Sequence, residues 1–373
     1  MSAHGTRRAL PNGARLVVVP PRPGVVAATV AVPLAGVTLE TAACAPAVAA
    51  RWAAELRAAA RAEDAVVRVD PVSTPDAAGF TVEALDPALL AAVPRWFRDA
   101  AAALPDPLAP PADPRAPADD RWSHPVRRAL FGSGHRYGLT PADRARAAQR
   151  PGGLRRAARA LAAVPPVLAA QAEGTHVDVL AAGLAALDHR GPDAGAGPPA
   201  PRPAATEQRA AAYYVLGLPG VALGAPTKCA HHVAWSLLGG REGMLDRSLR
   251  LDGGLTYSLA AFSRELAEGG YAVVYAACAP GTAGEVADRV QAVLDAARGG
   301  VPAHLVRGAA ERLVVAHHAA LETGRGVTER AARYEAAGLS PADLVAYPST
   351  VDQVTAEEVA AALTTATVLS GIR

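Results

Sequence analysis

The sequence predicts an α+β fold of two homologous halves, each a mostly antiparallel sheet backed by helices, that enclose a cleft. The same order of elements occurs twice along the 373 residues, at a spacing far longer than a solenoid repeat. That order is a strand, a helix, two strands and then helices. Between the two occurrences, residues 189–208 are dense in proline, glycine and alanine, as in a semi-rigid linker. We therefore expect an N-terminal half over 1–188 and a C-terminal half over 209–373.

The first half begins with two β-branched runs, 14–20 and 25–36, that predict strands. Residues 44–62 follow as a helix, because Val48, Trp52 and Leu56 recur at helical spacing. The other elements expected in this half are, in order, strands over 65–74 and 78–85, a helix over 87–104 kinked near Pro94, a proline-rich loop over 105–118, a helical region, a strand over 165–174 and a helix over 176–187.

The second half has the same order of patterns. A strand is predicted over 209–220, and a helix over 227–240 ends at two glycines. The elements expected after it are strands over 255–263 and 270–279 and helices over 284–300 and 302–324.

Composition and charge exclude several classes of function. The net charge of +2 gives no general attraction to nucleic acid or membrane, so neither is an expected partner. No uninterrupted apolar run reaches the roughly 18 residues that span a bilayer, and the N-terminus lacks the apolar core of a secretory signal, so we expect a cytoplasmic protein. The three cysteines lack CxxC spacing and are expected to be buried rather than paired or metal-bound.

Several histidines could be considered as metal ligands, but their spacing favours other roles. His318 and Glu322 lie one helical turn apart and follow His317, but two candidate ligands without a third favour an ordinary solvated helix face over a metal site. His231 and His232 lie on the helix before the glycine pair, where a structural role is expected.

Four stretches resemble motifs of the pitrilysin/insulinase superfamily of inverzincin metallopeptidases, within it the branch of the mitochondrial processing peptidase and its short bacterial relatives. They are LPNGARLVVVP (10–20), AGVTLE (35–40), FGSGHRYGLTP (131–141) and LLGGREGMLDRSLRLDGGLTYSL (237–259). In the third, Arg136 replaces the family's proline, and His135 and Tyr137 are expected to be structural. The resemblance covers nearly the whole chain and implies a fold that encloses a peptide cleft.

Catalytic members of this superfamily bind zinc through an H-x-x-E-H helix whose glutamate activates a water. None of the ten histidines here begins that motif. Counted from Glu40, the resemblance places the two ligand positions near Ala49 and Ala53 and the general base near Trp52. Methyl groups and an indole neither bind zinc nor deprotonate water, so no metal is expected in this chain.

The resemblance also implies a role for Arg250 and Tyr257. In the family, an Arg and a Tyr at this spacing reach the zinc of the other half or subunit and hold the substrate carbonyl as it becomes an oxyanion. A guanidinium is a permanent cation with several donors, and a phenol is a directed donor. A helix end followed by Gly253-Gly254 and a strand would let both side chains face one cleft. The alternative of a surface arginine and an ordinary strand tyrosine stays open.

The resemblance thus implies a non-catalytic subunit of a heterodimeric zinc metallopeptidase. A related partner subunit would carry H-x-x-E-H and the zinc, and this chain would complete the peptide chamber and supply Arg250 and Tyr257. The substrate would be a peptide, such as the leader of a modified precursor peptide. The isolated chain is not expected to be a zinc peptidase. The alternative is an inactive pseudo-peptidase that binds a peptide or protein as a scaffold.

Overall fold

The computed structural model describes residues 6–21, 23–103, 120–189, 206–210, 212–240 and 243–368. The chain divides into two compact units, and each combines three separate segments of the sequence. Unit 1 contains Met1–Pro114, Pro141–Pro199 and Ala319–Val345, and unit 2 contains Arg115–Thr140, Ala200–His318 and Ala346–Arg373. The predicted proline-rich loop and most of the predicted linker lie outside the described residues.

Unit 1 is built on a six-stranded sheet in the order β1-β2-β6-β3-β5-β4. The strands are β1 (Thr6–Ala9), β2 (Arg15–Val19), β3 (Val26–Pro33), β4 (Val67–Ser73), β5 (Ala77–Ala84) and β6 (Val167–Gln171). Neighbouring strands are antiparallel except β2 and β6. All eight residues of β3 are buried, because helices cover both faces of the sheet there.

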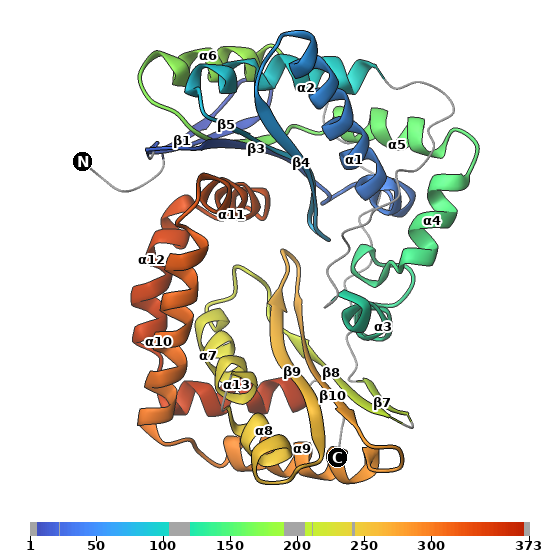
Figure 1. Cartoon of the computed structure of the whole chain (residues 1–373), viewed down its shortest axis with the longest axis vertical. Coiled ribbons are helices and arrows are strands. Elements are labelled where there is room, and N and C mark those ends of the chain that lie inside the picture. The colour runs from blue at the N-terminus through green and yellow to red at the C-terminus, as the bar shows by residue number, and fades with distance from the viewer. Residues whose placement is uncertain are drawn as a thin grey trace. The chain divides into compact units, whose positions relative to one another are not determined.

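The helices of unit 1 are α1 (Leu39–Ala62), the 3-10 helix η1 (Pro87–Ala92), α2 (Val93–Ala102), α4 (Pro141–Gln149), α5 (Gly153–Ala162), α6 (Thr175–Ala185) and α11 (Gly324–Ala336). The kink expected near Pro94 is the change from η1 to α2 at Val93. Figure 1 shows α1 and α2 on one face of the sheet and α11 on the other.

Helix α11 reaches this sheet from the C-terminal part of the sequence. The Thr29 hydroxyl donates to the Thr328 hydroxyl at 2.9 Å, and Glu335, fully buried on α11, forms an ion pair with Arg7 of β1 at 2.8 Å. Ala331 and Ala332 pack into an apolar cluster with residues of β2, β3 and β6. The sheet face of unit 1 is therefore completed by residues almost 300 positions away in the sequence.

Unit 2 is built on a four-stranded antiparallel sheet in the order β7-β8-β10-β9. The strands are β7 (Thr206–Ala210), β8 (Tyr213–Gly220), β9 (Thr256–Glu265) and β10 (Gly270–Cys278). The prediction of one strand over 209–220 was wrong at its start, because the chain reverses and Ala210 pairs with Tyr213. An alanine-rich reversal carries none of the Asn-Gly signals that mark most tight hairpins.

The helical elements of unit 2 are α3 (Asp120–Phe131), η2 (Arg136–Gly138), α7 (Lys228–Gly239), α8 (Met244–Asp246), the π-helix η3 (Arg247–Leu251), α9 (Ala283–Arg298), α10 (Ala303–Ala320) and α13 (Ala356–Val368), with α12 (Pro341–Asp352) starting in unit 1. Leu130 and Phe131 of α3 pack against β8 and β10. Tyr137 is fully buried and accepts the Glu268 N–H at 3.0 Å, which suits the structural role expected for its turn.

The two units repeat one topology. In unit 1, the chain runs β3-α1-β4-β5, and these strands lie in the order β3-β5-β4. In unit 2, it runs β8-α7-β9-β10, and the strands lie in the order β8-β10-β9. The predicted α+β fold with two equivalent halves is confirmed. Within the described ranges, no helix combines the length and the apolar character needed to cross a bilayer.

Candidate functional site

The site lies in unit 2, where the end of α7 meets the edge strand β9. A Cβ atom on Gly239 would lie 1.9 Å from the Ala261 carbonyl oxygen, so only glycine allows the helix to approach the strand this closely. At Gly240, a Cβ atom would lie 2.7 Å from the Ser236 carbonyl oxygen. Close packing therefore requires both glycines at the end of the predicted helix.

The chain then forms a widened turn before it enters β9. The Asp252 N–H donates to the Arg247 carbonyl at 2.8 Å, which closes the five-residue loop of a π-helix, a feature frequent at functional sites. Gly254 has a φ of +60°, and a Cβ atom on Gly253 would lie 2.5 Å from the Ser248 carbonyl oxygen. Both glycines are required for the corner that directs the chain into β9.

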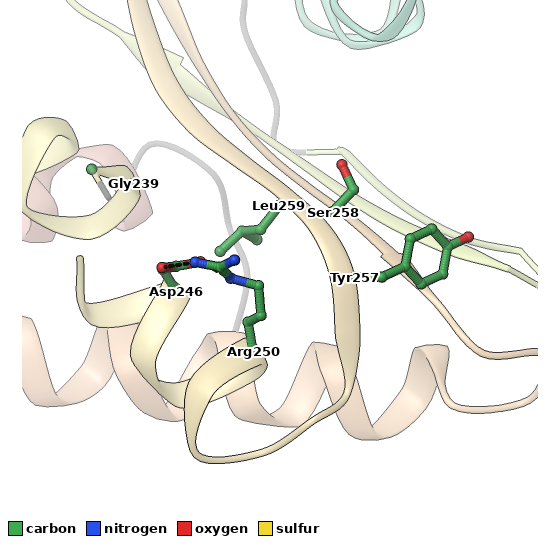
Figure 2. A pocket seen from close by; sticks show the side chains of 7 residues that line it. Gly239, Asp246, Arg250, Tyr257, Ser258 and Leu259 are labelled. Atoms are coloured by element: carbon green, nitrogen blue, oxygen red, sulfur yellow. Dashed lines mark hydrogen bonds and ion pairs between the residues drawn. The ribbon is translucent and has the colours of Figure 1, made fainter. Parts of the chain in front are cut away.

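Arg250 lies on this π-helix and binds Asp246, four residues earlier. Its Nε–H donates to Asp246 Oδ1 at 2.7 Å, and its Nη2–H donates to Oδ2 at 2.8 Å (Figure 2). The Asp246 side chain is 11% exposed, whereas the Arg250 side chain is 44% exposed. The hydrogen bonds to Asp246 raise the pKa of Arg250 above its ordinary value, so the guanidinium is charged near neutral pH.

Tyr257 is the second residue of β9 and is 73% exposed. Figure 2 shows its ring directed away from the guanidinium of Arg250. Both residues nevertheless line one pocket of about 320 Å³, together with Gly239, Gly240, Asp246, Ser258 and Leu259. The structure thus brings the two sequence-predicted residues to one pocket, and no hydrogen bond joins them within the described part of the chain.

Sequence reasoning missed Asp246 and Ser258 as members of this site. The signal for Asp246 was present, since an acidic residue four positions before an arginine on a helix is placed to pair with it. Ser258 carried no comparable signal, because one serine in a strand pattern is common. The side chain of Ser258 contributes a neutral hydroxyl to the pocket.

Among the described residues that line the pocket, the polar groups suit an acceptor oxygen, and none of them is a base that could activate a nucleophile. Its described lining contains one cation, Arg250, and one carboxylate, Asp246, which is occupied by that cation. Neither histidine nor cysteine is among these lining residues. A guanidinium and neutral donors suit a carbonyl oxygen that gains negative charge.

The positions to which the resemblance assigns the zinc motif lie in the core of unit 1. Ala49, Trp52 and Ala53 on α1 are each 0% exposed. The Trp52 ring packs edge-on against Phe97 with centroids 5.1 Å apart. These side chains hold no donor atom for a metal, so they do not fit zinc, and nowhere in the described ranges do three His, Cys, Asp or Glu side chains cluster as metal ligands.

His231 and His232 belong to a polar network around the buried carboxylate of Glu265. His232 bonds to Glu265 Oε2 through Nε2 and to the Tyr347 hydroxyl through Nδ1 at 2.8 Å, and Trp235 Nε1–H donates to His231 Nε2 at 3.2 Å. Burial alone raises the pKa of Glu265, but the hydrogen bond with His232 and the nearby His231 Nδ1, 3.5 Å from Oε1, outweigh it and hold this pKa well below its ordinary value.

His317, one of the residues considered above as a possible metal ligand, is buried and stacks on Tyr347 with ring centroids 4.9 Å apart. It therefore packs against the same network, and among the residues that the structure describes it belongs to no group of three metal-ligand side chains.

Comparison with protein families gives one match, which covers residues 187–313 and is described as the peptidase M16 inactive domain. This segment includes α7, the π-helix and β9, and so the whole described pocket. Comparison with curated proteins finds no match.

Several solved structures share the fold over almost the whole chain. One is the peptidase M16 inactive domain from Pseudomonas fluorescens, with a TM-score of 0.73 and 17% identity over 97% of this chain and 95% of that one. A protease from Helicobacter pylori has a TM-score of 0.74 and 14% identity, over 98% and 97% of the two chains. A chain of complex III2 from Candida albicans has a TM-score of 0.75 and 13% identity, over 96% and 92%.

The structural likenesses establish the fold. The family match over residues 187–313 supports the resemblance to the pitrilysin superfamily for that segment, and the sequence contains no H-x-x-E-H motif.

Proposed function

We propose that this chain, whose residues 187–313 match the inactive domain of M16 peptidases, is the non-catalytic subunit of a two-chain zinc metallopeptidase. The partner is a related subunit that carries H-x-x-E-H and binds the zinc. This chain completes the peptide chamber and supplies Arg250 and Tyr257 to the substrate. The reaction is hydrolysis of a peptide bond, and the leader of a precursor peptide is one candidate substrate.

The observation that carries the proposal is the contrast between the two sites. At the positions of the zinc motif, fully buried apolar side chains form the core. At the other site, Arg250 and Tyr257 line an open, mostly polar pocket. The Arg250 side chain is 44% exposed and is held by a carboxylate that is 11% exposed, so its guanidinium is oriented and can contact a ligand.

The chemistry of this chain is the binding of a carbonyl oxygen. The amide oxygen gains negative charge as its carbon is attacked, and fixed donors stabilise the charged state more than the neutral one. One such donor contributes about 3–4 kcal/mol in comparable sites, or 10²- to 10³-fold in rate. Activation of the attacking water is the task of the partner, because no residue of the described pocket can perform it.

The experiment is reconstitution with a related H-x-x-E-H protein encoded beside this chain. Each chain is purified alone and with the other, zinc is quantified, and hydrolysis of a fluorogenic peptide library is measured. We expect hydrolysis only when both chains are present. Zinc-dependent hydrolysis by this chain alone would refute the proposal. A stable complex without hydrolysis in any pairing would favour the scaffold alternative.

A further inference from the structure

A second cavity lies in unit 2, apart from the pocket that Arg250 and Tyr257 line. Its volume is about 480 Å³, and none of its described lining residues belongs to that pocket. The end of β8, the first turns of α7, the end of α12 and the start of α13 border it, and α13 packs against α7 (Figure 1). A cavity of this volume is large enough for a small organic ligand.

The described lining of this cavity is mostly apolar. Pro219, Cys229 and Ala230 are buried, and Val354 and Ala362 add apolar surface from α13 and the segment before it. Burial raises the pKa of the Cys229 thiol, so the thiol is neutral near neutral pH. Such a lining favours the apolar body of a ligand, because transfer of apolar surface out of water is favourable.

The buried polar groups beside this lining are already engaged within the protein. His231 Nε2 accepts the Trp235 Nε1–H at 3.2 Å, and His231 Nδ1 lies 3.5 Å from Glu265 Oε1. Besides burial, the charges of Lys228 and Glu265 act on the pKa of Cys229 in opposite directions. The network behind the lining therefore adds little net charge to the cavity, and His231 offers a ligand neither nitrogen.

The exposed side of the cavity carries negative charge. Glu358 is the one carboxylate among the described lining residues, and neither lysine nor arginine is among them. Its Oε2 atom accepts the Thr355 N–H at 2.8 Å and the Thr355 hydroxyl at 3.1 Å, and both donors are neutral. Asp352 and Glu357 add two exposed carboxylates close by in the sequence. The N-termini of α7 and α13 each carry about half a positive charge, which is less than the three carboxylates carry together.

We propose that this cavity is a binding site for a small organic ligand that has an apolar body and one ammonium group. The apolar body lies against α7 and α13, and the ammonium group pairs with the Glu358 carboxylate. The inference does not depend on the proposed function, because the cavity and the Arg250 pocket have no described lining residue in common.

The size of the preference for a cation follows from the exposure of Glu358. An ion pair with an exposed carboxylate raises affinity by about threefold over a neutral group in the same place. A carboxylate on the same apolar body loses a similar factor, because it meets a like charge. The ammonium ligand should therefore bind about tenfold more tightly than the carboxylate ligand.

The experiment is a titration of the full-length chain with three ligands that share one apolar body. They are 4-phenylbutylamine, which is an ammonium ion at neutral pH, 4-phenylbutanol, which is neutral, and 4-phenylbutanoate. Binding is followed through the ¹³C-methyl resonances of Val354, which are identified by their loss in Val354→Ile. We expect all three ligands to shift these resonances, with affinity highest for the amine and lowest for the carboxylate.

One pair of variants tests the role of the charge. In Glu358→Gln, the amine and the alcohol should bind equally, and the glutamine can still accept from the Thr355 N–H. Glu357→Gln is the matched control, because Glu357 is an exposed carboxylate that is not among the described lining residues. This control should keep the threefold preference for the amine.

A second pair of variants tests the place. Ala361 lines the cavity and is exposed, so the larger side chain of Ala361→Trp should block the cavity and weaken all three ligands at least tenfold. Ala145→Trp, at an exposed position of α4, should leave all three affinities unchanged. Circular dichroism verifies the folding of each variant, and the comparison of the three ligands on the wild type needs no variant.

Val354 resonances that none of the three ligands shifts would overturn the site. Equal affinity of the wild type for the amine and the alcohol would overturn the preference for a cation. A preference for the amine that persists in folded Glu358→Gln would overturn the role of Glu358, and unchanged affinities in folded Ala361→Trp would overturn the assignment to this cavity.

Discussion

Replacement of Gly239 with alanine tests whether the pocket depends on the close approach of α7 to β9. The new Cβ atom would lie 1.9 Å from the carbonyl oxygen of Ala261, 2.6 Å from its carbonyl carbon and 2.7 Å from its Cβ atom. Backbone atoms of a paired strand cannot rotate away, so the helix end must shift by more than 1 Å to restore normal contact. Overpacking of this kind costs about 1–3 kcal/mol of unfolding free energy.

The assay is urea denaturation followed by circular dichroism, with Gly308→Ala as the matched control. Gly308 lies inside α10, and a Cβ atom there meets nothing closer than an arginine nitrogen at 3.7 Å. The same chemical change should stabilise the chain at Gly308 by about 0.5–1 kcal/mol, because alanine is the better helix former. A Gly239→Ala chain as stable as the wild type would refute the packing account of the pocket.

Three further predictions concern the rest of the molecule. Glu265→Gln should lower the unfolding free energy by about 3 kcal/mol, since His231 and His232 lose their buried anion, whereas exposed Glu311→Gln should have little effect. Because the folded pKa of Glu265 is depressed, its contribution to the unfolding free energy is complete above the ordinary pKa of 4.5 and is lost as the pH falls below that value. The unfolding free energy of Glu265→Gln should therefore fall less steeply with decreasing pH than that of the wild type, and an identical pH dependence would contradict this. Thr328→Val should cost about 1–2 kcal/mol by urea denaturation, because the buried Thr29 hydroxyl and the Gly324 carbonyl lose a partner, and exposed Thr364→Val, which has only a local bond, should cost less. The three buried thiols should resist iodoacetamide at pH 8 until denaturant is added, since burial raises the pKa of Cys44 to about 11; rapid alkylation of the native chain would contradict their burial.

The sequence predicted those elements whose packing repeats at short range. The β-branched run of β3, the helical stripe of Val48, Trp52 and Leu56, and the change of helix near Pro94 all depend on neighbours within a few residues. The glycine pairs also carried clear local signals, because helix ends and sharp corners require them. The order of these elements was then sufficient to predict the repeated α+β plan.

The exchange of segments between distant parts of the chain could not be predicted. Helix α11 completes the sheet of unit 1, and α3 packs on the sheet of unit 2, although each comes from the other half of the sequence. Helix periodicity shows that one face is buried but not which sheet buries it. The predicted boundaries of the two halves along the sequence stay a prediction.

The candidate site could be predicted from the sequence only in part. Arg250 and Tyr257 were found through a resemblance, and the structure places both on one pocket. The pairing of Arg250 with Asp246 follows ordinary i,i+4 helical spacing and was therefore within reach of the sequence, whereas nothing in the strand pattern marked Ser258 as a residue of the pocket.

The most direct test of the proposed function is the kcat/KM of the reconstituted two-chain peptidase with Arg250→Ala in this subunit. The account predicts a fall of about 10²- to 10³-fold with subunit affinity unchanged. Arg247→Ala, on the same π-helix but outside the pocket lining, should retain the wild-type rate. A wild-type rate in Arg250→Ala, or an equal loss in both variants, would contradict the claim that this chain holds the substrate carbonyl.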